Sequence, residues 1–317
     1  MTSRPPGPIR LQPLARARVE SLGEVGAAWA ATLPARLAET AARWSLTLGR
    51  PRPGGSSSYV VSARTPDGRD VVLKMAMPDP GLDEQVEALR RADGRGYVRL
   101  LGYDSARRAL LLEALGGSLQ QSGRPVADQL RLLADTLALA WRPAADHPVA
   151  PTDKAAGLRD LVAHLWRELD RPCPEPVIDQ ALAYADRRAA DPGELVVVHG
   201  DPHPGNLLAV PGGRRGAETG WCFVDPDGFV ADRAYDLGVV LRDWTGQLEG
   251  ADGLDGAGAR RRLAGYAALL AGYTGVDVDR IWEWGYLERV STGLYVMAFG
   301  ADRAAAPFLR TAALLLD

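Results

Sequence analysis

The feature of this sequence that most restricts its fold is an apolar run that breaks into a loop rich in proline and glycine. Residues 195–198 (Leu-Val-Val-Val) precede the loop 199–206 (His-Gly-Asp-Pro-His-Pro-Gly-Asn), and apolar residues then resume. A β-branched run bounded by turn residues is typical of a buried strand. The loop carries a carboxylate, Asp201, and an amide, Asn206, with four residues between them. A buried strand therefore brings two oxygen-bearing side chains to one loop.

A second acidic segment follows after a short connection. Residues 221–224 (Trp-Cys-Phe-Val) predict another strand, which residues 225–228 (Asp-Pro-Asp-Gly) end. In protein kinases a loop Asp takes the proton of the substrate hydroxyl, an Asn with this spacing holds Mg²⁺, and a later Asp also holds it. We therefore expect Asp201 to act as the base and Asn206 and Asp225 to bind magnesium. The alternatives are a loop-capping Asp, a turn Asn and a solvated strand end.

Composition sets broad limits on the partners of the chain. Its 317 residues are 46% hydrophobic and 24% charged with a net charge of -3, a normal globular balance for one large domain or two lobes. No basic stripe is visible, so we expect no nucleic-acid partner. No segment is apolar enough for a membrane span or a secretory signal. Cys173 and Cys222 lack metal-ligand spacing and predict buried, reduced thiols, as in a cytoplasmic protein.

The first part of the chain predicts a small antiparallel sheet. Residues 65–68 (Thr-Pro-Asp-Gly) are strong turn residues between two apolar runs and indicate a hairpin. Residues 1–13 read as a loose, proline-rich arm, and Pro34 interrupts a run with helical spacing. The expected elements are a helix over 25–44, strands over 59–63, 70–75, 98–103 and 109–113, and a helix over 82–92.

A glycine- and serine-rich segment at 54–58 opens this hairpin, and Lys74 lies on its second strand. In kinases such a loop covers the ATP phosphates and the strand lysine pairs with them. Alone, both features are typical of an ordinary turn and a solvated lysine, and the downstream loop favours the nucleotide role. A kinase also supplies a helix glutamate to the lysine. Three residues of the 82–92 helix are open as that partner: Glu84, Gln85 and Glu87.

Beyond residue 115 the periodicity is mostly helical, so the chain predicts an α+β protein with two lobes. We place a nucleotide-binding lobe over 1–115 and a helical lobe, with the catalytic loop and acceptor site, over 116–317. A ligand is expected between them, with Gly116 and Gly117 as a hinge. Helices are expected over 126–141, 155–171, 176–190, 235–248, 256–273, 278–300 and 303–316.

Three motifs together resemble the aminoglycoside phosphotransferases and their relatives. They are the loop 199–206, the strand end 224–227 (Val-Asp-Pro-Asp) and residues 232–237 (Asp-Arg-Ala-Tyr-Asp-Leu). Softer features at 29–44 and 87–101 are similar to the streptomycin phosphotransferase branch, which includes aminoglycoside/hydroxyurea kinases. The resemblance implies a two-lobed, protein-kinase-like fold with a small antiparallel-sheet N-lobe and a mostly helical C-lobe.

The resemblance also implies a role for each matching residue. Asp201 becomes the catalytic base and Asn206 and Asp225 the magnesium ligands. Asp236 braces the catalytic loop through backbone N–H groups, with His199 and His203 as further structural support. The expected ATP-binding residues are Lys74, Gly55, Ser56, Ser57, Glu113 and Leu115, the last two at the adenine.

The implied reaction is the ATP- and Mg²⁺-dependent phosphorylation of an aminoglycoside hydroxyl, of the streptomycin type, which confers antibiotic resistance. Aminoglycosides are polycations, so their site needs acidic walls. Asp227 and Asp232 are the candidates for acceptor binding, and Asp243 and Glu283 lie on nearby elements. Asp227 is equally open as a second metal ligand or as a structural partner.

Three departures from the family pattern keep alternatives open. The chain has Ala-Asp-Arg at 231–233 where Gly-Asp-Pro is usual, Gln85 at the expected glutamate, and an apolar late helix at 293–299. The late helix leaves the acceptor undecided, so a metabolite hydroxyl of a sugar or amino alcohol is the second hypothesis. A nucleotide-binding pseudokinase is the third, and only Gln85 supports it.

Overall fold

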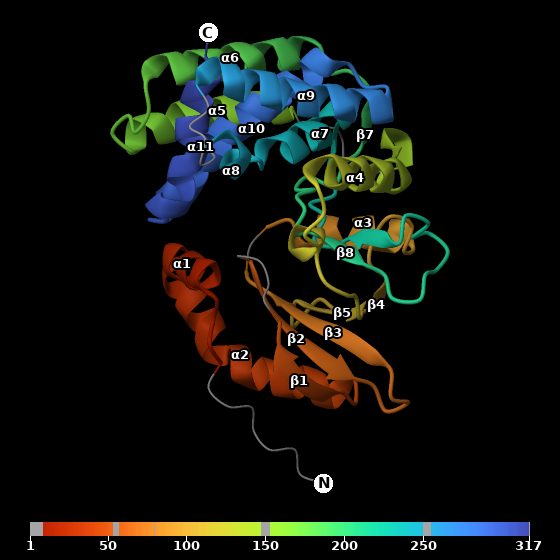
Figure 1. The fold of residues 1–317 in the computed structure, drawn as a ribbon. Coiled ribbons are helices and arrows are strands. Elements are labelled where there is room, and N and C mark those ends of the chain that lie inside the picture. The colour runs from red at the N-terminus through yellow and green to blue at the C-terminus, as the bar shows by residue number, and fades with distance from the viewer. Residues whose placement is uncertain (1–8, 53–56, 79, 147–152, 250–254, 317) are drawn as a thin grey trace. The chain divides into compact units, whose positions relative to one another are not determined.

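The computed structural model describes residues 9–52, 57–78, 80–146, 153–249 and 255–316, and every structural statement concerns these (Figure 1). The chain forms two units, residues 1–93 with 98–115, and residues 94–97 with 116–317. Residues 94–97, expected in the first lobe, join the second unit because the Gly96 N–H donates to Gly216 O at 2.7 Å and Gly96 O accepts from Phe223 at 2.8 Å. No helix in the described ranges is long and apolar enough to cross a membrane.

The first unit is built on a five-stranded antiparallel sheet with the order β1-β2-β3-β5-β4. The β2–β3 turn closes through Thr65, whose N–H donates to Arg69 O at 3.0 Å, and Gly68 has a φ of +84° that favours glycine. The predicted hairpin is therefore present with the predicted turn. The strands are β1 (Thr47–Pro51), β2 (Ser58–Arg64), β3 (Asp70–Ala76), β4 (Leu100–Asp104) and β5 (Ala109–Glu113).

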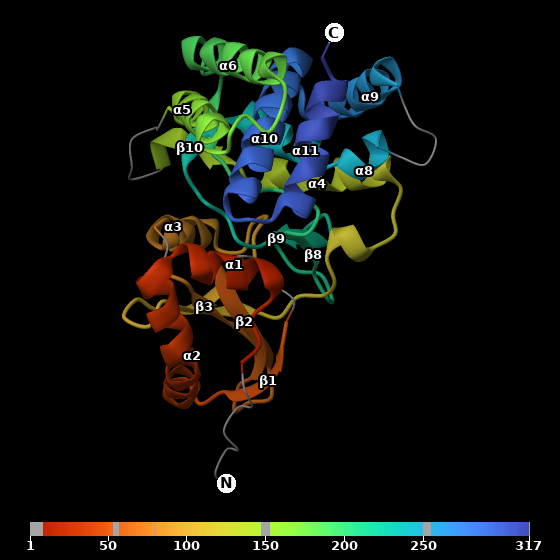
Figure 2. The same ribbon diagram turned by 90° about the vertical axis from the view of Figure 1, so that its left-hand side faces the viewer.

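One face of this sheet is covered by α2 (Gly23–Arg43), which continues through Pro34 (Figure 2). Leu33 of α2 packs in one buried cluster with Leu73 and Met75 of β3. Because side chains alternate across a strand, Lys74 points to the opposite face. Two elements were not predicted, α1 (Pro13–Ser21) and β1, and α1 overlaps the end of the expected arm. The helix expected over 82–92 is α3 (Leu82–Ala92).

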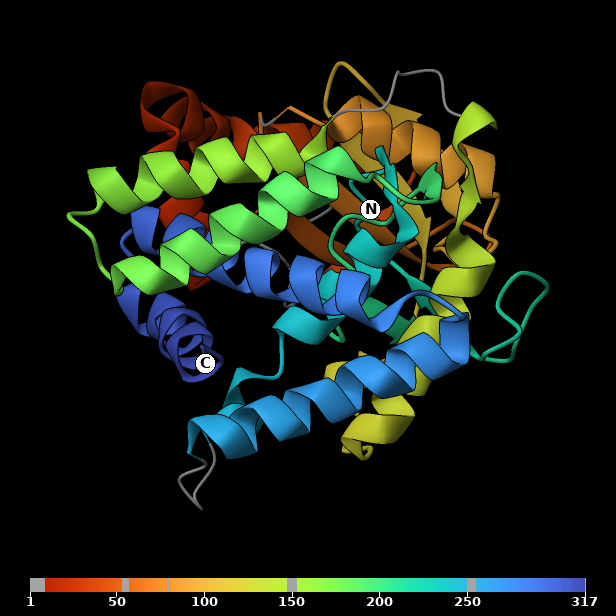
Figure 3. The same ribbon diagram turned by 90° about the horizontal axis from the view of Figure 1, so that it is seen from above.

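The second unit is mostly helical and is organised around α10 (Val278–Ala298). This helix packs against α5, α6, α7, α9 and α11, and Figure 3 shows α5 and α6 side by side. The other helices are α4 (Val126–Ala140), α5 (Lys154–Glu168), α6 (Glu175–Ala190), α7 (Arg233–Arg242), α8 (Thr245–Leu248), α9 (Gly256–Thr274) and α11 (Asp302–Leu314). They agree with the predicted helices except in one place.

The single helix predicted over 235–248 is two helices, α7 and α8. The chain leaves helical geometry at Trp244, which has a ψ of 35°, whereas the preceding Asp243 keeps helical dihedral angles. Its buried ring meets the edge of Tyr266 on α9, with ring centroids 6.0 Å apart. An aromatic contact with another helix thus accompanies the break. The periodicity of residues 235–248 carries no information about such a contact, so the single-helix prediction was wrong here.

Short strands connect these helices to the loop at 199–206. β10 (Val230–Asp232), β7 (Leu195–Val197) and β6 (Arg142–Pro143) form one three-stranded sheet. β8 (Leu207–Ala209) and β9 (Trp221–Phe223) form an antiparallel pair. The loop therefore runs from a central strand of one sheet to the first strand of another.

The close packing of α7 against α10 predicts that one added methyl group has a large effect on stability. A Cβ at Gly238 of α7 would lie 2.4 Å from Trp284 Cβ and 2.8 Å from Gly285 N of α10. We expect Gly238→Ala to lower the free energy of unfolding by about 1–3 kcal/mol, because overpacking displaces a buried helix. Urea denaturation followed by circular dichroism measures this.

Gly265 on α9 is the matched control, because nothing lies within 4 Å of a Cβ placed there. Gly265→Ala should raise the free energy of unfolding by up to about 1 kcal/mol through helix propensity. Equal effects of the two substitutions would contradict the packing described for α7 and α10.

Candidate active site

The β8–β9 pair brings together the two residues expected to bind magnesium. Leu207 pairs with Phe223, and one step further Val224 N–H donates to Asn206 O at 2.9 Å. Asn206 precedes β8 and Asp225 follows Val224, so both lie at the same end of the hairpin. Strands that are distant in sequence thus place an amide and a carboxylate next to each other.

The start of the loop is held by Asp236 of α7. Its Oδ2 accepts hydrogen bonds from His199 N and Trp141 Nε1, both at 2.8 Å, and its Oδ1 accepts one from Gly200 N at 2.9 Å. Asp236 is fully buried, and this burial raises its pKa to about 6 against the opposing effect of the three donors. These are the contacts that the bracing role requires. Trp141 is a partner that sequence reasoning did not identify.

Gly200 is required at its position in the loop. Its φ is +95°, and a Cβ there would lie 2.6 Å from the Asp227 side chain. Only glycine combines this backbone conformation with so close an approach.

The neutral ring of His199 holds the next turn of the loop in place. Its Nδ1 accepts from Asp201 N at 3.0 Å, so the ring proton is assigned to Nε2, which lies 3.0 Å from Val224 O. The ring is fully buried, stacked on Tyr97 and edge-on to Phe223, and this burial lowers its pKa to about 4. His199 therefore connects the loop to the end of β9 as a structural residue.

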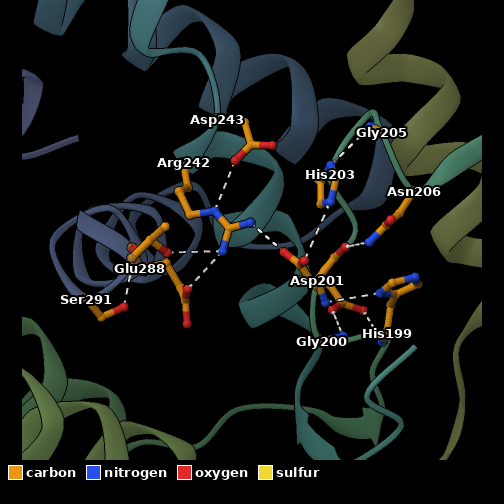
Figure 4. Close-up of polar contacts among 12 residues, drawn as sticks. His199, Gly200, Asp201, His203, Gly205, Asn206, Arg242, Asp243, Glu288 and Ser291 are labelled. Atoms are coloured by element: carbon orange, nitrogen blue, oxygen red, sulfur yellow. Dashed lines mark hydrogen bonds and ion pairs between the residues drawn. The ribbon is translucent and has the colours of Figure 1, made fainter. Parts of the chain in front are cut away.

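The Asp201 carboxylate lies beside two nitrogen-bearing side chains (Figure 4). Oδ1 accepts from Arg242 Nη2 at 2.5 Å, and Oδ2 lies 3.6 Å from Nε2 of His203, whose Nδ1 accepts from Gly205 N. Partial burial alone would raise the pKa of Asp201, but the Arg242 ion pair outweighs it and holds the pKa at about 2. Asp201 is therefore a carboxylate at neutral pH. Sequence reasoning missed Arg242, whose only local signal is a cation directly after an apolar helical run.

The side-chain nitrogen of Asn206 is hydrogen-bonded, and this bond orients the side-chain oxygen. Nδ2 donates to Asp201 O at 3.0 Å, and no described residue donates to Oδ1. Asp225 has a φ of +58°, an uncommon conformation for a residue with a side chain. An amide oxygen and a carboxylate at one hairpin end are the hard ligands that Mg²⁺ prefers, so the donor set fits this ion.

The acidic residues considered for acceptor binding have different surroundings. Asp227 is an exposed residue, but its carboxyl group lies against Gly200, and the resulting desolvation, together with the Asp201 charge, raises its pKa to about 6. Asp232 is instead buried, where it accepts from Ala234 N at the start of α7 and pairs with Arg280 at 3.1 Å. These contacts make Asp232 a helix cap and an ion-pair partner, so we leave it out of the acceptor site.

Asp243 and Glu283 are also engaged by arginines. Asp243 accepts from Arg242 at 3.0 Å, and Glu283 is 2.7 Å from Arg188 in a buried ion pair. Neither carboxylate is therefore available as a wall for a cationic acceptor.

In the first unit, Lys74 forms a hydrogen bond with Gln85, the uncharged residue among its three candidate partners. The Lys74 side chain is buried, and its Nζ donates to Gln85 Oε1 of α3 at 2.9 Å. Glu87 instead pairs with Arg91 at 2.5 Å. An amide therefore stands where a glutamate was expected, and it still orients the lysine.

The residues predicted to bind the adenine differ in whether their backbone N–H groups are already hydrogen-bonded. Glu113 N–H donates to Arg99 O at 3.1 Å, so this donor is already used within the sheet. Leu115 O accepts from Arg52 at 3.3 Å, and no described residue accepts from the Leu115 N–H. Ser57 O accepts from Met77 N at 2.9 Å, and the predicted Gly55 and Ser56 lie outside the described residues.

Known sequences resemble this chain over most of its length. It matches the model of a family described as aminoglycoside/hydroxyurea antibiotic resistance kinase over residues 43–300. A streptomycin 6-kinase of Streptomyces glaucescens is 28% identical over 92% of this chain and 91% of its own length. A hydroxyurea phosphotransferase of Kitasatospora aureofaciens is 29% identical over 83% of this chain and 72% of its own.

Solved structures share the fold at low sequence identity. A choline/ethanolamine kinase family protein from Mesorhizobium loti has a TM-score of 0.59 and 17% identity, covering 89% of this chain and 95% of its own. An aminoglycoside-3'-phosphotransferase of type VIII has a TM-score of 0.53 and 20% identity, covering 80% and 97%. The predicted protein-kinase-like α+β fold is therefore confirmed.

The buried neutral His199 predicts a pH dependence of stability. Its pKa is about 4 in the folded chain and 6.5 when exposed, so the unfolded chain binds the proton more readily between these values. Stability from this residue is complete above pH 6.5 and declines by about 3 kcal/mol as the pH falls to 4. Urea denaturation at pH 7, 6, 5 and 4 measures it.

His199→Gln removes the titration, so the stability advantage of the wild-type chain over this variant should shrink as the pH falls. His164 on α5 is exposed, and His164→Gln should leave the pH dependence unchanged. A constant difference between wild type and His199→Gln from pH 7 to 4 would exclude a buried neutral imidazole.

Proposed function

Since the chain belongs to the aminoglycoside/hydroxyurea antibiotic resistance kinase family, we propose that it transfers the γ-phosphoryl group of ATP to an aminoglycoside hydroxyl. Streptomycin is the first acceptor to test, because streptomycin 6-kinases of Streptomyces glaucescens and Streptomyces griseus are both 28% identical to the chain. The expected biological effect is resistance to that antibiotic.

The observation that carries this proposal is the Asp201 carboxylate on a rigid loop. Asp236 and His199 fix the backbone on either side of Gly200, and the Asp201 side chain remains 41% exposed. A carboxylate with a pKa of about 2 is a weak base. Phosphoryl transfer needs only that, because the hydroxyl proton becomes acidic late, as the bond to phosphorus forms. Asp201 would therefore orient the hydroxyl and receive its proton.

Each unit, taken by itself, has residues with the chemistry for binding part of a nucleotide. Asn206 Oδ1 and the Asp225 carboxylate would bind Mg²⁺, which neutralises phosphate charge when it is bound. In the first unit, the Lys74 ammonium would pair with phosphate oxygens, and the Leu115 N–H would donate to the adenine. The Gln85 amide orients Lys74 through a hydrogen bond from Nζ to Oε1.

Asp227 supports an acceptor that carries positive charge. Asp227 is an exposed residue, and its carboxylate is close enough to Asp201 for the two charges to interact. Two neighbouring carboxylates repel each other, and an ammonium or guanidinium group of the acceptor would relieve that repulsion.

The hydroxyurea phosphotransferase relative supports a second candidate, a small uncharged acceptor. A metabolite with a sugar or amino-alcohol hydroxyl is tested in the same way. An acceptor panel separates these cases: streptomycin and other aminoglycosides, hydroxyurea, simple sugars and amino alcohols, each with ATP and Mg²⁺. Mass spectrometry should detect the addition of one phosphate to an aminoglycoside, and a product with only the uncharged compounds would favour the second candidate.

Asp201→Asn removes the proton acceptor while keeping the size of the side chain. We expect kcat to fall by about 10²–10⁴-fold, the usual contribution of a positioned general base. ATP affinity, measured by calorimetry, should change less than about threefold. Turnover that survives this substitution would show that Asp201 is not the base.

Asp225→Asn tests the magnesium ligands. The amide is a weaker ligand for a hard cation, so half-maximal activity should require a higher Mg²⁺ concentration. Direct binding of Mn²⁺ in the presence of ATP, followed by electron paramagnetic resonance, should weaken in parallel. Asp279→Asn on the exposed start of α10 is the control and should leave both measurements unchanged. Unaltered Mn²⁺ binding in Asp225→Asn would contradict the assignment.

A further inference from the structure

Arg242, at the end of α7, holds a buried charge against Asp201. Its side chain is only 11% exposed, and every guanidinium nitrogen has a polar partner (Figure 4). Nη2 donates to Asp201 at 2.5 Å, Nε to Asp243 at 3.0 Å, and Nη1 to both Glu288 and Thr292, at 3.3 and 3.2 Å. A buried guanidinium that donates from all three of its nitrogens is held in one orientation.

The anchors of Arg242 do not depend on Asp201. Glu288 of α10 is 4% exposed, and its other oxygen accepts from Tyr235 Oη of α7 at 2.8 Å. Asp243 follows Arg242 directly in the chain. These two carboxylates would keep the guanidinium charged and fixed even if Asp201 turned away. Asp201 is the most exposed of the three carboxylates and so has the most room to change its orientation relative to this cation.

We propose that Arg242 is a positioning residue, whose guanidinium occupies Oδ1 of Asp201 and leaves Oδ2 as the oxygen that meets the acceptor hydroxyl. The proposal rests on the proposed function, because it assigns a task to Asp201. His203 Nε2 lies 3.6 Å from Oδ2, beyond the range of a good hydrogen bond, so this oxygen remains available. Without the guanidinium the carboxylate could rotate and present either oxygen.

The position of the carboxylate matters more to the reaction than its basicity. The ion pair makes Asp201 a weaker base, which a late proton transfer tolerates. Misplacement of a reacting group by about 1 Å can cost roughly 10²-fold in rate. The gain from orientation therefore exceeds the loss of basicity, and this predicts that a variant lacking the guanidinium is slower.

The test compares Arg242→Met and Arg242→Lys with wild type in a complete kinetic analysis. We expect Arg242→Met to lower kcat by about 10–100-fold with the KM for ATP changed less than twofold. Arg242→Lys should recover only part of kcat, because an ammonium lacks the fork of donors. Methylguanidine added to an Arg242→Ala variant should restore part of kcat, which a merely structural role would not predict.

Arg188→Met is the matched control for loss of a buried arginine. Arg188 pairs with Glu283 in the same unit, both side chains being 9% exposed, and neither touches the loop. This variant should lose stability to thermal unfolding while keeping kcat within twofold of wild type. An Arg242→Met variant that resembles Arg188→Met in both measurements would overturn the positioning role.

A crystal structure of Arg242→Met gives a readout that needs no acceptor. The Asp201 carboxylate should leave its wild-type orientation while the Asp236 contacts to His199 and Gly200 remain. An unmoved carboxylate would overturn the inference. If wild type phosphorylates no aminoglycoside, the proposed acceptor fails, and the same variants are then compared by ATP hydrolysis to water and by this structure.

Discussion

The active loop depends on one buried carboxylate that accepts hydrogen bonds from its backbone. Asp236 binds the N–H groups of His199 and Gly200, which would otherwise be buried without partners. An unsatisfied buried donor costs about 1–3 kcal/mol, so two of them would be enough to open the loop. Trp141 donates to the same carboxylate from a different segment. Asp236 thereby ties the loop, the start of α7 and the residue after α4 into one rigid element.

A short series of contacts from this element positions the other residues of the candidate site. Gly200 turns the chain next to Asp227, and the His199 ring binds both Asp201 N–H and Val224 O. Val224 is also paired with Asn206, and it precedes Asp225. The proposed base, Asp201, and the two proposed oxygen ligands, Asn206 and Asp225, are therefore positioned by backbone geometry, and only the last torsions of the Asp201 side chain remain to be fixed. Arg242 acts on those torsions.

The sequence predicted those parts of the site that depend on local spacing. The loop 199–206, the strand end at Asp225 and the brace Asp236 each belong to a short motif, and the strands around them alternate or run apolar in the usual way. The partners that pack on these motifs were missed. Arg242 meets Asp201 across 41 residues, and Trp141 meets Asp236 across 95, so no spacing rule reports either contact. Asp232 was assigned by its nearness in sequence, yet helix α10 supplies the arginine that engages it.

The charges around Asp201 bear on the kind of acceptor that the site would favour. The charges of Asp201, Glu288 and Asp236 all act on Asp227. Arg242 pairs with three carboxylates in this region, Asp201, Asp243 and Glu288. Lys154, whose Nζ lies 5.0 Å from the ring centroid of Phe229, acts to lower the pKa of Asp227, but this effect does not offset the contributions that raise it. The protein therefore leaves excess negative charge where the hydroxyl must approach. A polycationic acceptor supplies the missing charge itself, whereas an uncharged one must bind against this field, so the same electrostatics that hold the base also favour a cation beside it.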